Sequence, residues 1–199
     1  MNTDYWNKFY SDVMNTNPST FASFCLSYIS PNDSLIDIGC GDGRDSIFFA
    51  QRLKHVVSID NSSKTIDNLQ KTNKLSNNEF YNLDIESLQL FNQSMNKQFD
   101  VIYCRFLLHA IAEDREDILL NWAYKTLPIG GRIMIETRTT EDEKLPKHYD
   151  NHYRRYIDTN VLCHKLESLK FKIIHHEEGT GLSPFKAEDP YLARIVAEK

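Results

Sequence analysis

The residues best suited to chemistry in this chain lie in a short glycine-rich stretch. Asp37 follows an apolar run, and glycines then recur at alternating positions, Gly39, Gly41 and Gly43. Glycine tolerates positive φ angles, and its lack of a Cβ lets a ligand approach the backbone closely. The apolar segment 46–50 continues with helical character. A strand, a tight loop and a helix in this order aim loop amides and a helix N-terminus at a ligand, so we expect a binding loop rather than a plain turn.

Acidic residues follow the next two predicted strands. Residues 55–59 form an apolar run that ends at Asp60, where a carboxylate can accept hydrogen bonds from both hydroxyls of a nucleotide ribose. The alternative is that Asp60 caps the following helix, because Asp, Asn and Ser cluster there. Residues 79–83 are predicted to form the next strand, and Asp84 follows it. Asp84 is also a good N-cap for the short segment 85–90.

The glycine spacing separates two families of nucleotide-binding proteins. Dinucleotide oxidoreductases use Gly-x-Gly-x-x-Gly, whereas the Asp-x-Gly-x-Gly-x-Gly pattern here resembles motif I of class I S-adenosylmethionine (SAM)-dependent methyltransferases. The strand predicted over 99–104 resembles motif IV, and the Pro-x-Gly-Gly turn at 128–131, before a strand at 132–136, again resembles the family. The resemblance covers residues 34–199. It implies SAM as methyl donor and an α/β, Rossmann-like, doubly wound seven-stranded sheet, mostly parallel with an antiparallel last strand.

The resemblance also implies which residues touch the cofactor. Asp84 resembles the adenine-binding acid of the family, which accepts a hydrogen bond from the exocyclic amine. Cys104 and Arg105 end the motif IV strand, and ligands in open α/β sheets sit beyond the carboxyl ends of the strands. The expected cofactor contacts are Asp37, Gly39, Gly41, Gly43, Arg44, Asp60, Asn61, Asp84, Ile85, Cys104 and Arg105.

Aromatic residues recur at near-helical spacing in the N-terminal segment, residues 1–30. They predict two short amphipathic helices that pack on the domain. In the methyltransferases that the chain resembles, such a leading segment often also covers the cofactor. Tyr5, Trp6 and Tyr10 would then be cofactor neighbours.

A histidine follows the motif IV strand at the point where the methyl group would be presented. Methyl transfer from a sulfonium mainly requires alignment of donor and acceptor, and a hydroxyl acceptor also benefits from a general base. His109 could be that base or could orient the acceptor, since histidine ordinarily titrates near neutrality. The alternative is a packed core histidine, because segment 106–111 is largely apolar. His152 is the competing base.

A charged and aromatic insertion, residues 138–157, begins at the end of the strand predicted at 132–136. Loops at this rim usually shape the substrate pocket, although a charge-rich insertion is also typical of a solvated surface. Arginine binds carboxylate and phosphate in a bidentate way. We therefore predict a small, anionic acceptor, with O-methylation favoured and a sugar-linked or phosphorylated metabolite as an example. The expected acceptor contacts are Arg138, Tyr149, Tyr153, Arg154 and Arg155.

The remaining expectations for this insertion and its surroundings are structural. His148 and His152 are four residues apart, but we identify no dependable further metal ligand and expect a metal-free pocket. Residues 92–97 are polar and predict a surface loop. Helices are predicted over 113–126 and 159–169, and the last two strands over 171–176 and 191–197.

Length and composition bound the class of protein. The 199 residues, with 41% hydrophobic and 26% charged residues, indicate one soluble globular domain over 1–199. A net charge of −5 argues against a broad nucleic-acid-binding surface. No apolar run is long enough to span a membrane, and the polar start is no signal peptide. Four scattered cysteines without a CxxC pair indicate reduced thiols and a cytoplasmic protein.

Two other classes of function share part of this pattern. A nicotinamide-dependent oxidoreductase uses the same strand, loop, helix and acid, but the glycine spacing and the lack of a separate substrate domain weigh against it. A noncatalytic SAM-binding protein would carry the same binding residues without turnover.

Overall fold

The computed structural model describes residues 17–95, 97–147 and 153–199. Several of the candidate residues therefore lie outside the described residues: Tyr5, Trp6, Tyr10, His148, Tyr149 and His152.

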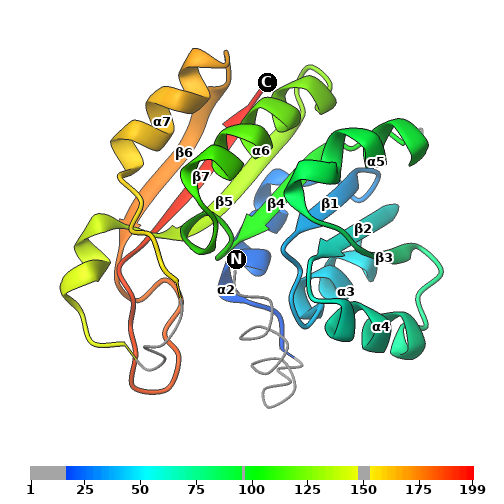
Figure 1. Cartoon of the computed structure of the whole chain (residues 1–199), viewed down its shortest axis with the longest axis horizontal. Helices are drawn as coiled ribbons and strands as arrows, with labels where there is room; N and C mark the ends of the chain where they lie inside the picture. The colour runs from blue at the N-terminus through cyan, green and yellow to red at the C-terminus, as the bar shows by residue number, and fades with distance from the viewer. Residues whose placement is uncertain (1–16, 96, 148–152) are drawn as a thin grey trace.

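A single sheet of seven strands runs through the described chain (Figure 1). The strands are β1 (Ser34–Ile38), β2 (His55–Asp60), β3 (Asn78–Asn82), β4 (Val101–Arg105), β5 (Arg132–Arg138), β6 (Lys172–Gly179) and β7 (Leu192–Glu198). Their order across the sheet is β3-β2-β1-β4-β5-β7-β6. Strands β1 to β5 pair in parallel, whereas β7 is antiparallel to both β5 and β6. The predicted doubly wound sheet with an antiparallel last strand is confirmed.

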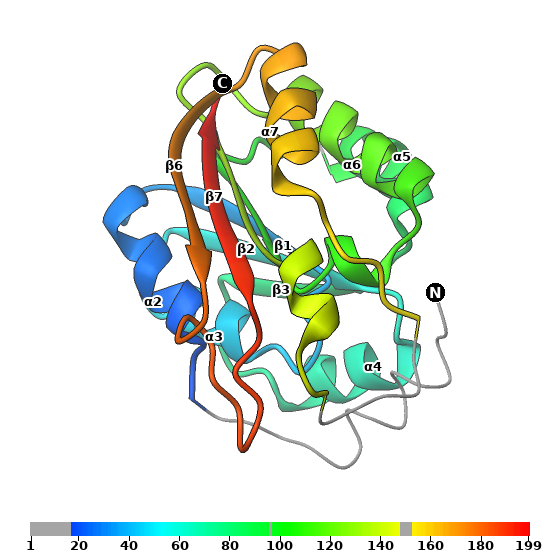
Figure 2. The same ribbon diagram turned by 90° about the vertical axis from the view of Figure 1, so that its left-hand side faces the viewer.

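Helices cover both faces of this sheet (Figure 2). The α-helices are α2 (Thr20–Cys25), α3 (Arg44–Ala50), α4 (Ser63–Thr72), α5 (Leu88–Met95), α6 (Glu113–Thr126) and α7 (Thr159–Ser168). Short 3₁₀ turns are η1 (Leu26–Tyr28), η2 (Ile85–Ser87), η3 (Leu108–Ala110) and η4 (Thr140–Lys144). No helix of the described chain is both long enough and apolar enough to cross a membrane.

Alternating residues of the strands divide the core into two layers. Ile36 and Ile38 of β1 pack in one buried cluster with residues of α6 and α7. Leu35, which points to the opposite face, packs in a second cluster with Phe21 of α2 and Phe49 of α3. Because successive side chains of a strand point to opposite faces, a strand buried on both faces is largely apolar, and in β1 Leu35, Ile36 and Ile38 are all buried.

Helix α5 corrects one expectation from the sequence. The polar segment 92–97 was predicted to be a surface loop, but α5 extends through Met95. Leu88 is buried in the core, and Phe91 and Met95 pack against it from the same helix. Their spacing of three and seven residues places them on one helical face, and this apolar stripe outweighs the polar residues between them.

The order of the strands creates a crevice at the carboxyl ends of the two central strands, β1 and β4. From β1 the chain continues to β2 on one side, whereas β4 lies on the other side of β1. Connections therefore leave in opposite directions at the carboxyl ends of β1 and β4. Ligands of open α/β sheets bind at this topological switch point.

Candidate active site

A cavity of about 400 Å³ opens at the switch point. Its size falls within the usual range of small-molecule sites, roughly 300–1,000 Å³. The glycine loop, the carboxyl ends of β1 to β5 and the connection between β6 and β7 all contribute to its wall. The predicted site residues that line it are Asp37, Gly39, Gly41, Arg44, Asp60, Asn61, Asp84, Ile85, Arg105, His109, Arg138 and Arg154.

The glycines of the loop are required by the surrounding protein as well as by the turn itself. Gly43 has φ +74°, and a Cβ there would stand 2.8 Å from Cδ2 of Leu69. A Cβ on Gly39, with φ +78°, would stand 3.0 Å from Leu107. The sequence suggested that glycine is needed here to let a ligand approach. At these two positions a Cβ would also meet neighbouring leucine side chains. Gly43 packs against α4 and does not line the cavity wall.

Asp60 is held by backbone amides at the cavity wall. Its Oδ2 accepts from the N–H of Gly41 at 3.0 Å, and its Oδ1 accepts from the N–H of Ser62 at 2.8 Å. Burial raises the pKa of Asp60, and backbone hydrogen bonds, including those from Ser62 and Gly41, oppose the rise. The N-cap of α4 is Ser62, whose side chain accepts from Thr65, so Asp60 itself does not cap the helix. A carboxylate has about four acceptor positions, so these amides leave capacity for a ligand hydroxyl.

Asp84 is paired with an arginine that the sequence argument missed. Its carboxylate accepts from the N–H of Ile85 at 2.6 Å, which makes it the N-cap of η2. Arg115 of α6 places Nη1 at 3.3 Å from Oδ1 of Asp84 and Nη2 at 2.7 Å from Glu86. Burial alone would raise the pKa of Asp84, but the hydrogen bond with Glu86 and the charge of Arg115 lower it. Asp84 is therefore both a cap and an ionised acceptor at the cavity.

Asp37 is buried at the end of β1 and accepts from Oγ of Ser46 at 2.6 Å. Burial raises its pKa to about 8, the Ser46 hydrogen bond opposes this, and nearby carboxylates, first Asp45 and then Asp60, add to the rise. Asp37, which the sequence predicted as a cofactor contact, lines the cavity. The raised pKa of Asp37 results from its burial in the folded chain, which the sequence alone does not show.

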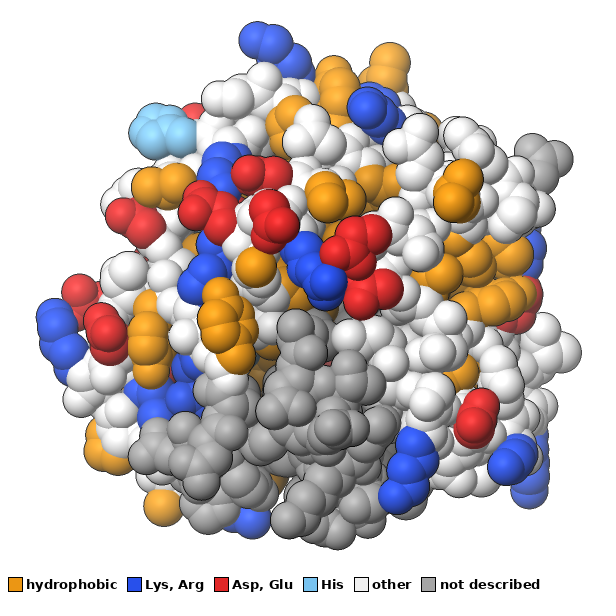
Figure 3. Space-filling model, in the orientation of Figure 1, with side chains coloured by type: hydrophobic (Ala, Val, Ile, Leu, Met, Phe, Trp, Pro, Cys, Tyr) orange, Lys and Arg blue, Asp and Glu red, His pale blue; other side chains and the backbone are white. Residues whose placement is uncertain are grey.

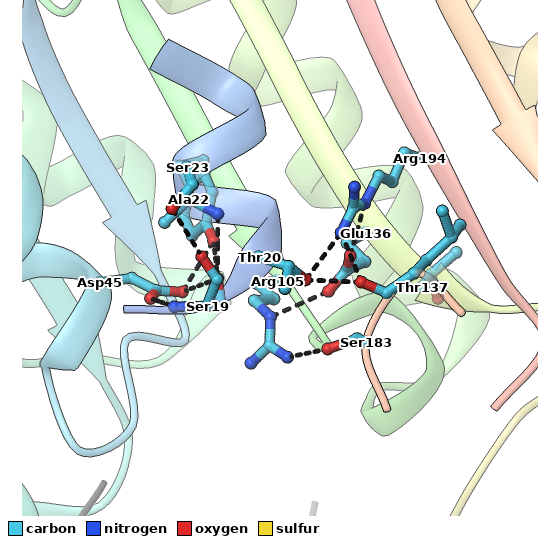
Figure 4. Close-up of polar contacts among 12 residues, drawn as sticks. Ser19, Thr20, Ala22, Ser23, Asp45, Arg105, Glu136, Thr137, Ser183 and Arg194 are labelled. Carbon is cyan, nitrogen blue, oxygen red and sulfur yellow. Dashed lines mark hydrogen bonds and ion pairs between the residues drawn. The ribbon is translucent and has the colours of Figure 1, made fainter. Parts of the chain in front are cut away.

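A second buried acid, Asp45, joins the N-terminal segment to the site (Figure 4). Its Oδ1 accepts from the N–H of Ser19 at 2.7 Å, and its Oδ2 accepts from Oγ of Ser19 at 2.7 Å. The hydroxyl of Tyr103 also donates to Oδ2 at 2.8 Å. Ser19, Asp45 and Tyr103 line the cavity together with Thr20. In the sequence Asp45 is simply an acid in the first turn of a helix, so nothing distinguished it.

Arg105 is positioned by Glu136, which lies between two arginines (Figure 4). Nε of Arg105 donates to Oε1 of Glu136 at 2.9 Å, and Nε of Arg194 donates to Oε2 at 2.8 Å. Nη2 of Arg105 donates to Oγ of Ser183 at 2.9 Å, in the connection between β6 and β7. Arg194 also holds Thr20 and the carbonyl of Leu182 through Nη2. Glu136 thus orients a cavity arginine and anchors two segments of the wall.

His109 is buried and bonded to β5. The backbone N–H of Arg138 donates to Nδ1 of His109 at 3.3 Å, and Oγ1 of Thr137 lies 3.3 Å from the same nitrogen. The carbonyl of His109 accepts from the N–H of Arg155 at 2.7 Å. The ring contacts Phe106 edge-on, with the ring centroids 5.3 Å apart. His109 is therefore a packed, hydrogen-bonded histidine that also lines the cavity.

The basic residues of the insertion have different surroundings. Nη1 of Arg138 donates to Asp142 at 2.7 Å and its Nη2 donates to Glu188, so two carboxylates neutralise this guanidinium. Arg154 lines the cavity. Arg155 instead pairs with Glu116 of α6 and does not contribute to the cavity wall.

Two further candidates lie away from the cavity. Tyr153 is half exposed. The side chain of Cys104 is fully buried in the core cluster that packs under α6 and α7. The alternation of side chains along a strand explains why Cys104 is absent from the cavity wall. Its neighbours in sequence, Tyr103 and Arg105, point to the other face and line the cavity.

Acidic and basic side chains are intermixed over α6 and α7 (Figure 3). Lys165 of α7 contacts the carboxylates of Glu113, Glu116 and Asp117 at 2.9 Å, 3.0 Å and 2.9 Å. Arg155 shares Glu116 with Lys165, so this network ties the segment after the insertion to α6. Among the described residues, no group of three or more His, Cys, Asp or Glu could hold a metal ion.

Comparison with known proteins identifies the family. The model of the family described as "Methyltransferase domain" matches residues 29–179. A relative from Methanobrevibacter smithii, named "Probable cobalt-precorrin-6B C(15)-methyltransferase (decarboxylating)", is 45% identical over 60 residues, which are 28% of this chain and 32% of the relative. A protein of the same name from Methanococcus vannielii is 37% identical over 75 residues, 36% of this chain and 41% of the relative. The chain thus spans only about a third of the length of the first of these relatives.

Solved structures share the fold at low identity. A SAM-dependent methyltransferase from Anabaena variabilis superposes with a TM-score of 0.76 at 19% identity, covering 98% of this chain and 92% of that one. The 1,6-didemethyltoxoflavin-N1-methyltransferase of Burkholderia thailandensis, solved with S-adenosylhomocysteine, gives a TM-score of 0.66 at 17% identity, covering 90% and 76%. The family match extends over well more than half of the chain and includes the glycine loop and the ends of β2 to β5. The chain belongs to the methyltransferase domain family.

Proposed function

We propose that this chain transfers a methyl group from SAM to a small anionic acceptor, with oxygen as the favoured nucleophile. The observation that carries the proposal is the chemistry of the cavity wall on the two sides of β1 in the strand order. Carboxylates of the glycine loop and of the ends of β2 and β3 contribute to the wall on one side, and Arg154, His109 and the connection between β6 and β7 contribute to the rest of it. We infer from this an acidic part for SAM and a second part for the acceptor.

The acidic part suits the nucleoside and the amino group of SAM. Asp60 retains acceptor capacity for ribose hydroxyls after binding its backbone amides. Asp84 is ionised and oriented by Arg115, so it can accept from the adenine amine. Arg105 can bind the carboxylate of SAM, because no described residue accepts a hydrogen bond from its Nη1 and the residue lines the cavity. Tyr5, Trp6 and Tyr10 stay predictions as further cofactor neighbours.

The acceptor part combines one cationic side chain with apolar walls. Arg154 adds a guanidinium to the wall, and Phe106, Phe185 and Pro184 add apolar surface. Arg138 lines the same region but is neutralised by Asp142 and Glu188, so its role is to hold the wall. This division favours a small acceptor with one acidic group and an apolar body.

The chemistry asks little of the protein beyond alignment. Bound SAM supplies a methyl group on a positively charged sulfur, which is already activated for displacement. The residues of the chain bind and orient the two partners and exclude water from the cavity, and such alignment is worth several kcal/mol of the barrier.

Calorimetric titration with SAM tests the cofactor part of the proposal. Asp60→Ala should weaken binding about ten- to hundredfold, because hydrogen bonds to a charged group contribute roughly 1.5–3 kcal/mol. Asp60→Asn should lose less, since the amide oxygen can still accept. Asp67→Ala, which removes an exposed acid on α4, is the matched control. Unchanged affinity in a folded Asp60→Ala variant would exclude the ribose role, and binding of a nicotinamide nucleotide instead of SAM would overturn the proposal.

Incubation of the protein with isotopically labelled SAM and fractionated metabolite extracts tests the acceptor part. Label should enter small anionic metabolites. A cobalt-precorrin belongs in the screen as a purified candidate, because several matched relatives carry that name. Label transferred only to acceptors from the neutral or cationic fractions of the extract would refute the anionic acceptor, and SAM binding without transfer to any fraction would instead indicate a noncatalytic SAM-binding protein.

A further inference from the structure

The position of His109 follows from the way in which β4 ends beside β5. In the parallel ladder, Arg105 pairs with Glu136, and the N–H of Phe106 donates to the carbonyl of Glu136 at 2.8 Å. Continued for one more step, this ladder would join the N–H of Arg138 to the carbonyl of Phe106. Phe106 instead has φ 55°, a left-handed conformation that is unusual for an aromatic residue. The chain therefore turns away, and the N–H of Arg138 loses its ladder acceptor.

The ring of His109 replaces that acceptor. After Phe106 the chain forms η3, which brings His109 back over the end of β5, and the Arg138 N–H then donates to Nδ1 at 3.3 Å. Strand β7, which lies on the other side of β5, cannot accept a hydrogen bond from this N–H of Arg138. Thr139 donates to the carbonyl of Tyr191 at 3.2 Å, so in the antiparallel β5–β7 ladder the N–H of Arg138 points away from β7. The hydrogen bond from Arg155 to the carbonyl of His109 fixes the turn from its other end.

This contact determines which nitrogen of His109 carries the proton. A backbone N–H is always a donor, so Nδ1 must present its lone pair to Arg138. The hydroxyl of Thr137, 3.3 Å from Nδ1, can donate to the same nitrogen. In a neutral imidazole with an accepting Nδ1, the proton is on Nε2. A general base would need the opposite tautomer, in which the hydrogen on Nδ1 would face that of Arg138.

We propose that His109 is an Nε2–H donor that orients the acceptor, and that the nucleophilic atom of the acceptor is already ionised before methyl transfer. This inference rests on the proposed methyltransferase function and narrows its acceptor. The general-base role considered from the sequence is replaced by a donor role.

The balance of the reaction then requires no proton transfer to the protein. A lone pair of the acceptor oxyanion forms a bond to the methyl carbon as the carbon–sulfur bond breaks, and the electron pair of that bond stays on sulfur. The negative charge of the acceptor and the positive charge of the sulfonium disappear together. A carboxylate, or another acid that is ionised at neutral pH, meets this requirement. An alcohol does not, because it would have to give up a proton to a base.

Nitrogen NMR of the chain tests the tautomer directly. The protein is labelled with nitrogen-15 in its seven histidines and measured near neutral pH without SAM or acceptor. The signals of His109 are those missing from the spectrum of His109→Gln. We expect a proton on Nε2 of His109 and none on Nδ1. His164 is the contrast, because its side chain is 82% exposed and its Nδ1 lies 3.5 Å from a carboxylate oxygen of Glu167, which favours a proton on Nδ1. A proton on Nδ1 of His109, or on both nitrogens, would overturn the proposal. Because this measurement needs no ligand, its outcome is independent of the proposed function.

Two variants separate a donor from a base in the transfer reaction. His109→Gln keeps an amide N–H near the position of Nε2, and His109→Asn keeps an acceptor near Nδ1 but has no donor at Nε2. Label transfer from SAM to the anionic fraction of the extract should fall about 10²–10³-fold in His109→Asn, the usual loss when an oxyanion donor is removed. His109→Gln, which keeps a donor, should retain most of the transfer activity of the unaltered protein. Equal loss in both variants, with intact folding and SAM affinity, would refute the donor role, and absence of transfer by the unaltered protein would count against the proposed function instead.

Discussion

Replacement of Glu136 by Gln should destabilise the fold strongly, and much more than replacement of the exposed Glu198 by Gln. The Glu136 side chain is 0% exposed and accepts from Nε of Arg105 and Nε of Arg194, whose side chains are only 14% and 7% exposed. Glutamine has nearly the same shape, but it carries no charge and presents an N–H to one of the two arginines. Among the described residues, Arg105 would then keep no ion-pair partner, and Arg194 would keep only Glu177, at 3.7 Å.

The expected cost follows from the burial of the pair. Removal of one partner from a buried ion pair costs about 3–5 kcal/mol, because the charge left behind remains desolvated. In a domain of about this size, each kcal/mol lowers the melting temperature by roughly 2–4 °C, which corresponds here to about 6–20 °C. Glu136→Gln should also weaken SAM binding, since Arg105 would lose the contact that orients it.

The chain provides a matched control in Glu198. This residue also accepts two hydrogen bonds from one arginine, Arg132, at 2.9 Å and 2.7 Å, but both side chains are 32% exposed. A solvent-exposed pair contributes about 0–1 kcal/mol, so Glu198→Gln should have little effect. Equilibrium unfolding in urea measures both variants. Equal destabilisation by Glu136→Gln and Glu198→Gln would refute the reasoning, because burial would then not determine the cost.

Two further predictions concern the glycine loop and its acid. Asp37 has a pKa of about 8 in the folded chain against 3.8 as the ordinary value, so the folded state holds a proton that the unfolded state has lost. Stability without ligand should therefore fall as pH rises from about 4 to 8, by up to about 1.4 kcal/mol per pH unit, and Asp37→Asn should flatten this dependence in urea unfolding. An identical slope in both proteins would contradict the buried, protonated Asp37. Gly43→Ala should lower the melting temperature more than Gly130→Ala, because both have positive φ but only the first Cβ would collide, at 2.8 Å from Leu69. Equal losses would show that φ alone determines the cost.

Local patterns in the sequence determined most of the fold and the outline of the site. Each strand end that the sequence marked with an acid, at Asp37, Asp60 and Asp84, lies at the cavity. A strand, a glycine turn and a helix are encoded within a few neighbouring residues, and parallel strands bring their carboxyl ends to the same edge. The pattern failed at α5, where a sparse apolar stripe among polar residues resembled a loop.

Contacts between distant residues determined what each candidate does. Asp45 reaches Ser19 across 26 positions, and Glu136 joins Arg105 and Arg194 across 31 and 58. These partners share no spacing rule, because the chain between them is folded into strands and helices whose packing alone brings the side chains together. The tertiary structure likewise gives the basic residues of the insertion different surroundings. Arg138 is neutralised by carboxylates, Arg155 pairs with Glu116 of α6, and Arg154 lines the cavity.

The sequence by itself determined the class of fold and predicted SAM as the methyl donor, because a cofactor used by a whole family is bound by short backbone motifs that each carry their own signal. Only the tertiary structure supports the tautomer that we propose for His109. The sequence showed a histidine after a strand, which suits a base and a donor equally. The end of β4 at Phe106 aims the Arg138 N–H at Nδ1, and that choice depends on the register of two strands 27 residues apart along the chain rather than on the residues around the histidine.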